Sequence, residues 1–207
     1  VVHRSESGTP LRMVGSIRNI DDRKRYDAEI HHLAFYDALT GLPNRRLLMD
    51  RLQQAILMNH RHHRIGALMY IDMDRFKALN DTHGHAMSDR LLVEVGTRLR
   101  STVRKHDTVA RLGGDEFVVM LEQLASSSEE ALARATEVAR KVLEVLGAAY
   151  DLGQVLYVST PSIGVTLVLD RDETMDDVLQ RADMAMYDAK AARSEERRVG
   201  KECRSRW

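Results

Sequence analysis

The sequence predicts a mixed α/β fold, an α+β sandwich in which helices flank one central, mostly antiparallel sheet. Residues 65–71 form a near-continuous apolar run, the pattern of a strand that is buried on both faces of a sheet. Two β-prone runs, residues 109–111 and 118–121, surround Gly113 and Gly114. This arrangement favours a hairpin, because glycine adopts positive φ without a steric cost. The elements are expected in the order helix, strand, helix, hairpin, helix, hairpin, helix.

The composition is that of an ordinary globular chain. Of 207 residues, 43% are hydrophobic and 30% are charged, which suffices for one α/β domain with an appendage. The 31 basic and 31 acidic side chains balance, so no overall field favours nucleic acid, and we expect no nucleic-acid partner. The single cysteine, Cys203, excludes an internal disulfide and a cysteine-based zinc cluster. It fits a reducing compartment.

The hydropathy pattern argues against a membrane span within this sequence. No apolar run approaches the roughly 18 residues that a spanning helix needs. We therefore expect no membrane contact from this fragment and a cytoplasmic location, although a longer protein could be anchored upstream of Val1.

The two ends of the chain differ in character from its middle. Residues 1–21 contain a turn and an alternating strand pattern over 11–20, so we assign them to the end of a preceding domain. Residues 22–36 form a linker, with a helix expected from 22 to about 37. Residues 193–207 show no periodicity and have little to bury. We interpret them as a vector-derived tail outside the fold.

The linker helix carries a short apolar stripe. Asp21 or Asp22 is expected to cap it, and Tyr26, Ile30 and Leu33 follow at spacings of four and three. Such a stripe suits a two-stranded coiled coil that would join two copies of the chain. Packing against its own domain is equally compatible, because the stripe is too short to distinguish the two.

Within the main domain, residues 37–192, capping and breaking residues mark the elements. Asn44 is placed to cap a helix from 45 to about 60, and Thr174 a last helix over 175–192. Pro161 indicates that its strand is irregular or lies at an edge of the sheet. The other expected elements are a short helix or turn at 75–81, an amphipathic helix ending near 103, a helix over 131–146, and a hairpin of 149–156 with 157–169.

Carboxylates gather at two predicted strand ends. Asp72 and Asp74 leave the buried strand, and Asp115 and Glu116 follow the glycine pair at the hairpin tip. Ligand sites in open α/β sheets collect at strand ends, and a bare glycine backbone lets a phosphate ester approach beside a hard cation. A solvated turn contains the same residue types, so these residues alone leave both interpretations open.

Several separate motifs, in order along the chain, carry a resemblance to a known family. They are residues 37–45 (DALTGLPNR), 72–81 (DMDRFKALND), 113–117 (GGDEF), 162–165 (SIGV) and 182–190 (ADMAMYDAK). Over roughly residues 37–192 the sequence resembles the GGDEF family of diguanylate cyclases. The resemblance implies a fold like the palm of nucleotide polymerases and adenylyl cyclases. It also implies a nucleotidyltransferase that condenses two GTP into cyclic di-GMP and two pyrophosphates.

The resemblance implies catalytic roles for Asp115, Glu116 and Lys77. Asp72, the backbone carbonyl of Met73, Asp115 and Glu116 would hold Mg²⁺ or Mn²⁺, hard cations that prefer oxygen ligands. Asp115 would also accept the proton of the attacking 3′-hydroxyl, and Lys77 would stabilise the phosphates.

The resemblance also implies substrate contacts. Asn80 and Asp89 match guanine readers, because a carboxylate accepts from N1–H and N2–H₂ of guanine and an amide pairs with O6 or N3. By residue type alone, Lys77 and His85 suit a solvent-facing helix and Asp89 a helix N-cap, so these alternatives remain open. Further substrate contacts are implied at His85, Gly113, Gly114 and Lys190.

Two further features follow from the resemblance. Arg104 and Asp107 match an RxxD site at which cyclic di-GMP would inhibit its own synthesis, although charged residues after a helix are commonly a solvated loop. Ser194 stands where the family has an arginine, which predicts weakened GTP binding. Each domain would hold one GTP, so the active form would be a homodimer brought together through the linker helix.

Two other interpretations remain. The chain could be a catalytically silent module that binds GTP or cyclic di-GMP in a longer signalling protein, with a phosphodiesterase domain beyond residue 192. A purely structural coiled-coil dimeriser would leave the acidic hairpin unexplained. Residues 19–24 (NIDDRK) resemble the end of a PAS sensor domain, which would then precede the linker.

Overall fold

The computed structural model describes residues 2–4, 6–7, 9–13, 21–153, 155–169 and 173–204. The chain divides into two compact units, Val1–Ala34 and Phe35–Trp207. Within the described ranges, no helix combines the length and the apolar character that a membrane span requires.

The first unit contains a small hairpin and a helix. Strands β1 (Val2–Arg4) and β2 (Pro10–Met13) pair antiparallel, and α1 spans Asp21–Phe35. The strand expected over 11–20 is seen only to Met13, because residues 14–20 lie outside the described part. On α1, Ile30 and Leu33 are 65% and 62% exposed, whereas the side chain of Tyr26 is not described. The assignment of residues 1–21 to a sensor domain remains a prediction.

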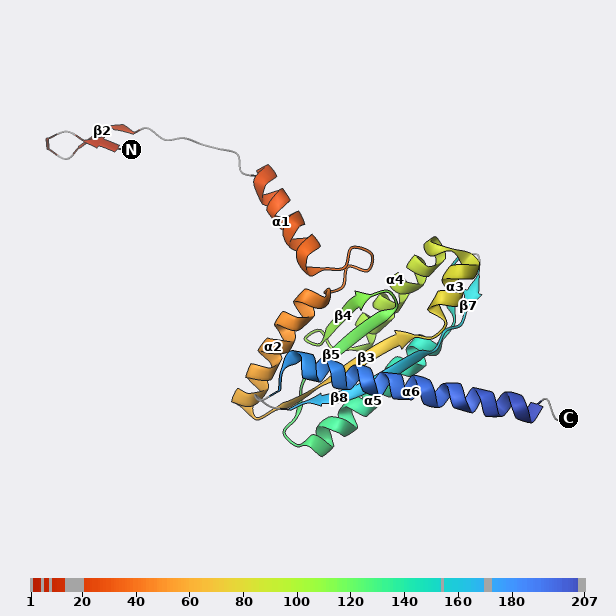
Figure 1. Cartoon of the computed structure of the whole chain (residues 1–207). Helices are drawn as coiled ribbons and strands as arrows, with labels where there is room; N and C mark the ends of the chain where they lie inside the picture. The colour runs from red at the N-terminus through yellow and green to blue at the C-terminus, as the bar shows by residue number, and fades with distance from the viewer. Residues whose placement is uncertain are drawn as a thin grey trace. The chain divides into compact units, whose positions relative to one another are not determined.

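The second unit is built on a four-stranded antiparallel sheet in the order β4-β5-β3-β8 (Figure 1). Its strands are β3 (Ile65–Met73), β4 (Thr108–Gly113), β5 (Glu116–Ala125) and β8 (Pro161–Val168). Strand β3 is central and buried at every position after Ile65, as its apolar run predicts. The predicted fold class, a mixed α/β fold with a central antiparallel sheet flanked by helices, is confirmed.

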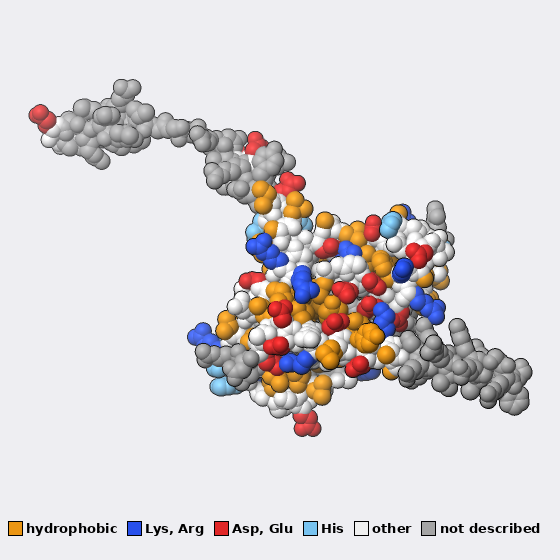
Figure 2. Space-filling model, in the orientation of Figure 1, with side chains coloured by type: hydrophobic (Ala, Val, Ile, Leu, Met, Phe, Trp, Pro, Cys, Tyr) orange, Lys and Arg blue, Asp and Glu red, His pale blue; other side chains and the backbone are white. Residues whose placement is uncertain are grey.

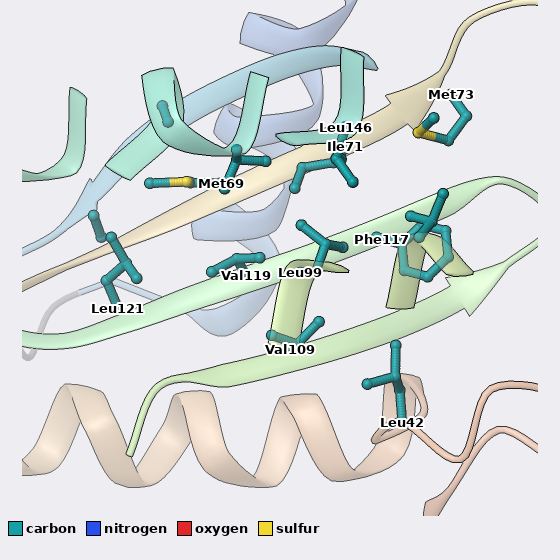
Figure 3. Packing of buried hydrophobic residues seen from close by; sticks show 14 of the residues in the cluster. Leu42, Met69, Ile71, Met73, Leu99, Val109, Phe117, Val119, Leu121 and Leu146 are labelled. Atoms are coloured by element: carbon teal, nitrogen blue, oxygen red, sulfur yellow. The ribbon is translucent and has the colours of Figure 1, made fainter. Parts of the chain in front are cut away.

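Helices cover both faces of this sheet. Alternate residues of β3, beginning with Ala67, Met69 and Ile71, pack with α4 (His85–Thr102) and α5 (Ser128–Gly147). Figure 3 shows this cluster from close by, with Leu99 and Leu146 contributed by the two helices. The opposite face, with Leu68 and Tyr70, packs against α2 (Arg45–His62) and α6 (Met175–Arg204). Two separate hydrophobic clusters therefore hold β3 from both sides.

Most predicted elements are present, with shifted ends. The Asn44 side chain accepts from the Leu47 amide at the start of α2, and Thr174 accepts from the Asp177 amide at the start of α6, so both caps are confirmed. The short helix expected at 75–81 is α3 (Phe76–His83). Acidic and basic side chains are interspersed on the face shown in Figure 2, as the balanced composition predicts.

Two expectations about the last third of the domain are only partly met. The predicted hairpin of 149–156 with 157–169 forms only where the two runs meet, as β6 (Tyr150–Asp151) paired with β7 (Leu156–Tyr157). The rest of the second run is β8, which pairs with β3 and lies at the edge of the main sheet, as Pro161 predicted. The last helix also continues past Ala192 to Arg204. Residues 193–204 are rich in Glu, Arg and Lys, which favour the helix and extend it without a new nucleation step.

Gly164 sets how closely α6 approaches the sheet. A Cβ atom at this position of β8 would overlap the carbonyl oxygen of Ala182 and the amide nitrogen of Met186, both in α6. Only a residue without a side chain lets helix backbone lie directly on strand backbone here. The position of α6, and of every residue that it carries toward the end of β3, therefore depends on this glycine.

We expect Gly164→Ala to lower the free energy of unfolding by about 3 kcal/mol, because the added methyl forces α6 away from β8. Urea denaturation followed by circular dichroism measures this change. The matched control is Gly147→Ala, since a Cβ at Gly147 meets no atom within 4 Å, and its effect should stay below about 1 kcal/mol. Equal effects of the two substitutions would contradict the proposed constraint.

Candidate functional site

The acidic hairpin has the predicted geometry. Strands β4 and β5 are joined at Gly114-Asp115, and Gly113 pairs with Glu116. Gly113 and Gly114 have φ values of 150° and 50°, in the region that favours glycine. No atom lies within 4 Å of a Cβ built at either glycine, so the backbone of the turn is open to a ligand.

The end of β3 brings a second set of acids to this turn. Asp72 is the direct register partner of Glu116, and the Met73 amide lies 3.4 Å from the Asp115 carbonyl oxygen. Asp72 is only 9% exposed. The structure thus gathers the four residues predicted to hold a metal, Asp72, Met73, Asp115 and Glu116, at one end of the sheet.

Burial and mutual repulsion characterise the carboxylates of this site. Burial raises the pKa of the Asp115 carboxyl above its usual range, and the nearby charge of Asp72 raises it further. Burial also raises the pKa of the Tyr70 hydroxyl, as do its hydrogen bond to Glu116 and the charge of that carboxylate. Tyr70 precedes Asp72 by two positions on the same face of β3. Its contact with Glu116 is a feature that sequence reasoning missed.

Lys190 supplies positive charge to the buried acids. Its Nζ donates to Oδ1 of Asp72 at 2.6 Å, from the middle of α6 to the end of β3. Burial alone would lower the pKa of Lys190, but the hydrogen bond and the charge of Asp72 prevail and raise it. The residue predicted to contact phosphate therefore contacts a predicted metal ligand.

The Asp74 carboxylate accepts hydrogen bonds from hydroxyl groups, whereas the Asp72 carboxylate accepts one from Lys190. The Asp74 carboxylate accepts from the hydroxyls of Thr160 at 2.7 Å and Ser162 at 2.9 Å, and the Asp74 backbone carbonyl accepts from Ser159 at 2.9 Å. These bonds fasten the segment that enters β8 to the end of β3. The run of hydroxyl residues around Pro161 was the signal in the sequence for this role.

Arg111, which sequence reasoning also missed, stabilises the turn through hydrogen bonds. Arg111 donates from Nη1 to both carboxylate oxygens of Asp37, at 3.0 and 3.1 Å. Its Nε and Nη2 donate to the carbonyl of Gly114, at 3.1 and 2.8 Å. Burial alone would raise the pKa of Asp37, but hydrogen bonds from Thr40 and Arg111 prevail and lower it. The loop at 37–44 thus fixes the residue that precedes Asp115.

The predicted guanine readers lie on α3 and α4. Oδ1 of Asn80 lies 3.4 Å from the Ser88 hydroxyl, which joins the two helices, and Asp89 is exposed in the first half of α4. Asp89 does not cap that helix, because α4 begins at His85 after Gly84. It lines a cavity of about 440 Å³ together with the apolar side chains of Leu39, Val93 and Leu152 and the charged residues Arg90, Glu94 and Asp151.

Lys77 and His85 are exposed side chains on the same pair of helices. In the described part of the chain, no hydrogen bond or ion pair joins either of them to the acidic residues at the turn. Their solvent-facing positions agree with the alternative that residue type suggested, and leave both side chains accessible to a ligand.

The predicted inhibitory residues lie in different environments. The Asp107 side chain is only 5% exposed. Its carboxylate accepts from the amides of Arg104 at 2.9 Å and Glu122 at 3.3 Å, so it holds its own loop. Arg104 is exposed and lines a cavity of about 430 Å³ together with Arg51, Arg100 and Lys105. Asp107 lines the same cavity, but its carboxylate is already hydrogen-bonded to two backbone amides, whereas the Arg104 side chain is exposed.

The donor set at the turn fits a hard divalent cation that arrives with a nucleotide. Among the described residues, no three His, Cys, Asp or Glu side chains form a ready metal cluster. Mg²⁺ does not need one, because it commonly binds through one or two carboxylates, several waters and substrate phosphates. Asp72, Asp115 and the carbonyl of Met73 would supply oxygen ligands of this kind.

Comparison with known proteins identifies the family of the chain. Residues 34–196 match the family model described as diguanylate cyclase, GGDEF domain. The bifunctional diguanylate cyclase/cyclic di-GMP phosphodiesterase MucR of Pseudomonas aeruginosa is 42% identical over 166 residues, 80% of this chain and 23% of MucR. Diguanylate cyclase TpbB of the same organism is 40% identical over 174 residues, 84% of this chain and 39% of TpbB. The chain thus spans less than half the length of these curated relatives.

A solved structure extends the comparison to three dimensions. The GGDEF domain of TpbB from Pseudomonas aeruginosa superposes with a TM-score of 0.70 at 39% identity, and the match covers 76% of this chain and 89% of that one. The acidic turn, the sheet that carries it and the sequence match lead to one conclusion: the chain belongs to the GGDEF diguanylate cyclase family.

Proposed function

We propose that the chain is an active diguanylate cyclase that condenses two GTP into cyclic di-GMP and two pyrophosphates. The observation that carries the proposal is the meeting of Asp72 with Asp115 and Glu116 at a glycine turn whose backbone is open. One buried and two half-buried carboxylates at a glycine turn suit a cation with bound phosphate, whereas a merely solvated turn does not require them to converge.

The reaction joins the 3′-oxygen of one GTP to the α-phosphorus of the other, and pyrophosphate leaves with the electrons of the broken P–O bond. Asp115 would take the 3′-hydroxyl proton. Glu116 would add negative charge beside it, and this charge also contributes to the raised pKa of Tyr70. Bound Mg²⁺ or Mn²⁺ would neutralise phosphate charge during the transfer.

Substrate binding draws on the surrounding elements. Asp89 and Asn80 would read the guanine edge, and the cavity beside Asp89 offers apolar surface for a flat base. Lys77 and Lys190 would neutralise the triphosphate, with His85 as a further contact. The open backbone at Gly113 and Gly114 leaves room for the phosphates.

Activity requires two copies, because each site holds one GTP and the bond forms between two of them. The highly exposed Ile30 and Leu33 of α1 are the candidates for joining the copies as a short coiled coil. Cyclic di-GMP would restrain the enzyme by binding Arg104, while Asp107 keeps that loop in shape. The use of GTP and the single cysteine suit a cytoplasmic location.

The second candidate function is a silent binding module of a longer protein. Ser194, in place of an expected arginine, is the observation that favours it, because one phosphate contact would be lost. The relative MucR, whose name includes both synthesis and hydrolysis of cyclic di-GMP, shows that such domains occur in longer chains.

We expect Asp115→Asn to lower the rate of cyclic di-GMP formation at least about 100-fold, because it removes both a cation ligand and the proton acceptor. Mass spectrometry of reactions with GTP and Mg²⁺ measures the product. Asp50→Asn, an exposed change on α2, should retain the wild-type rate. An unaltered rate in Asp115→Asn would refute the assigned role, and absence of product from dimeric wild-type protein would favour the silent module.

Arg104→Ala should weaken binding of cyclic di-GMP about tenfold or more, because a charge-assisted contact to the ligand is lost. Titration calorimetry with cyclic di-GMP tests this. Arg140→Ala, an exposed change on α5, serves as the charge-matched control and should bind as the wild type does. If Arg104→Ala and the control bind equally, the feedback site lies elsewhere.

A further inference from the structure

We propose that Lys190 is an exchangeable cation that links metal binding to nucleotide binding. It bonds to Asp72 until a nucleotide triphosphate offers it another anion, and only then is Asp72 available to a divalent cation. The inference rests on the proposed function, since it concerns the same substrate and metal.

The Lys190–Asp72 contact competes directly with a metal ligand. At 2.6 Å between Nζ and Oδ1 it is a short, charge-assisted hydrogen bond. The Asp72 side chain is only 12% exposed, so few other directions of approach to its oxygens remain open. A divalent cation at Asp72 would also lie within a few ångströms of the ammonium group, where like charges repel strongly.

The two partners differ in their freedom to move. Asp72 is fixed in the central strand, next to Met73 and opposite Glu116. The Lys190 side chain is 43% exposed and has a flexible four-carbon stem. The helix backbone is packed on the sheet, because Ala182 and Met186, which precede Lys190 on α6, are buried in the hydrophobic cluster on this face. Exchange is therefore a rotation of the lysine side chain and not a shift of α6.

The nucleotide supplies what the exchange requires. Its phosphates are anions for the ammonium group, and they are also ligands for the cation that takes its place. The metal displaces Lys190 toward the phosphates, and the nucleotide draws Lys190 away from Asp72. Each ligand therefore raises the affinity for the other, which is positive cooperativity by linkage. A metal ion that binds without nucleotide has to displace Lys190 from Asp72, and no phosphate then compensates the ammonium group.

The ordinary alternative is a permanent ion pair that only anchors α6 to the sheet. Partly exposed ion pairs contribute little to stability, so stability alone does not discriminate between the two interpretations. The affinity for metal in the absence of nucleotide does discriminate between the two interpretations. An exchangeable lysine opposes metal binding, whereas an anchoring lysine that orients Asp72 supports it.

The experiment titrates the full chain with Mn²⁺ alone by calorimetry, and then with Mn²⁺ in the presence of a non-hydrolysable GTP analogue. Lys190→Met should bind Mn²⁺ alone about tenfold more tightly than the wild type, and the gain in affinity that the analogue brings should shrink. Lys190→Arg keeps the charge and should resemble the wild type. Lys77→Met removes one charge that has no contact with Asp72 and should change the affinity for Mn²⁺ alone less than about twofold.

The outcomes separate this inference from the function on which it rests. Equal or weaker binding of Mn²⁺ alone by Lys190→Met would overturn the exchange, provided that urea denaturation shows a folded protein. An equal increase in Lys77→Met would also overturn it, because the effect would then be general electrostatics. If the wild type binds neither Mn²⁺ nor the GTP analogue, the proposed function itself fails, and the exchange with it.

Discussion

The close approach between Gly164 and the backbone of α6 is the constraint on which the rest of the site depends. It allows Met186 to lie against β8, which is next to the central strand β3. Lys190 follows one helical turn later and contacts Asp72. A charged contact at the end of the sheet is thus positioned by a contact between two stretches of backbone. The site is determined as much by a residue without a side chain as by its charged groups.

The second requirement is to keep several acids close together. Three carboxylates at the end of the sheet repel one another, and burial makes their charge costly. The chain offsets this with Lys190 on Asp72 and Tyr70 on Glu116. Arg111 fixes the turn from outside the acidic group, through Asp37 and the Gly114 carbonyl. The raised pKa of Asp115 reflects the remaining repulsion and burial at this end of the sheet.

The sequence was sufficient for features that local patterns encode. The buried strand β3, the glycine turn and the helix caps at Asn44 and Thr174 follow from hydrophobicity and capping chemistry. The pairing of β8 with β3 does not, because any strand can pair with many others and only tertiary packing selects one. The extension of α6 was missed because residues 193–204 lack an apolar stripe, while helix propensity continues through such a segment.

In the predicted site, too, local motifs point to residues, whereas the contacts between those residues depend on tertiary packing. Resemblance to known motifs identified Asp72, Asp115 and Lys190, but not that Lys190 contacts Asp72, since residue spacing carries no side-chain direction. Asp107 likewise matched a ligand motif, while its carboxylate accepts from the amides of Arg104 in its own loop and of Glu122 on β5. Arg111 and Asp37 are 74 positions apart and became partners only through the fold.

We propose that the chain makes cyclic di-GMP at the acidic turn, and the stoichiometry of the products tests this proposal. Dimeric protein supplied with GTP and Mg²⁺ is predicted to release two pyrophosphates for each cyclic di-GMP formed. Formation of GDP and phosphate in place of these products would contradict the claim.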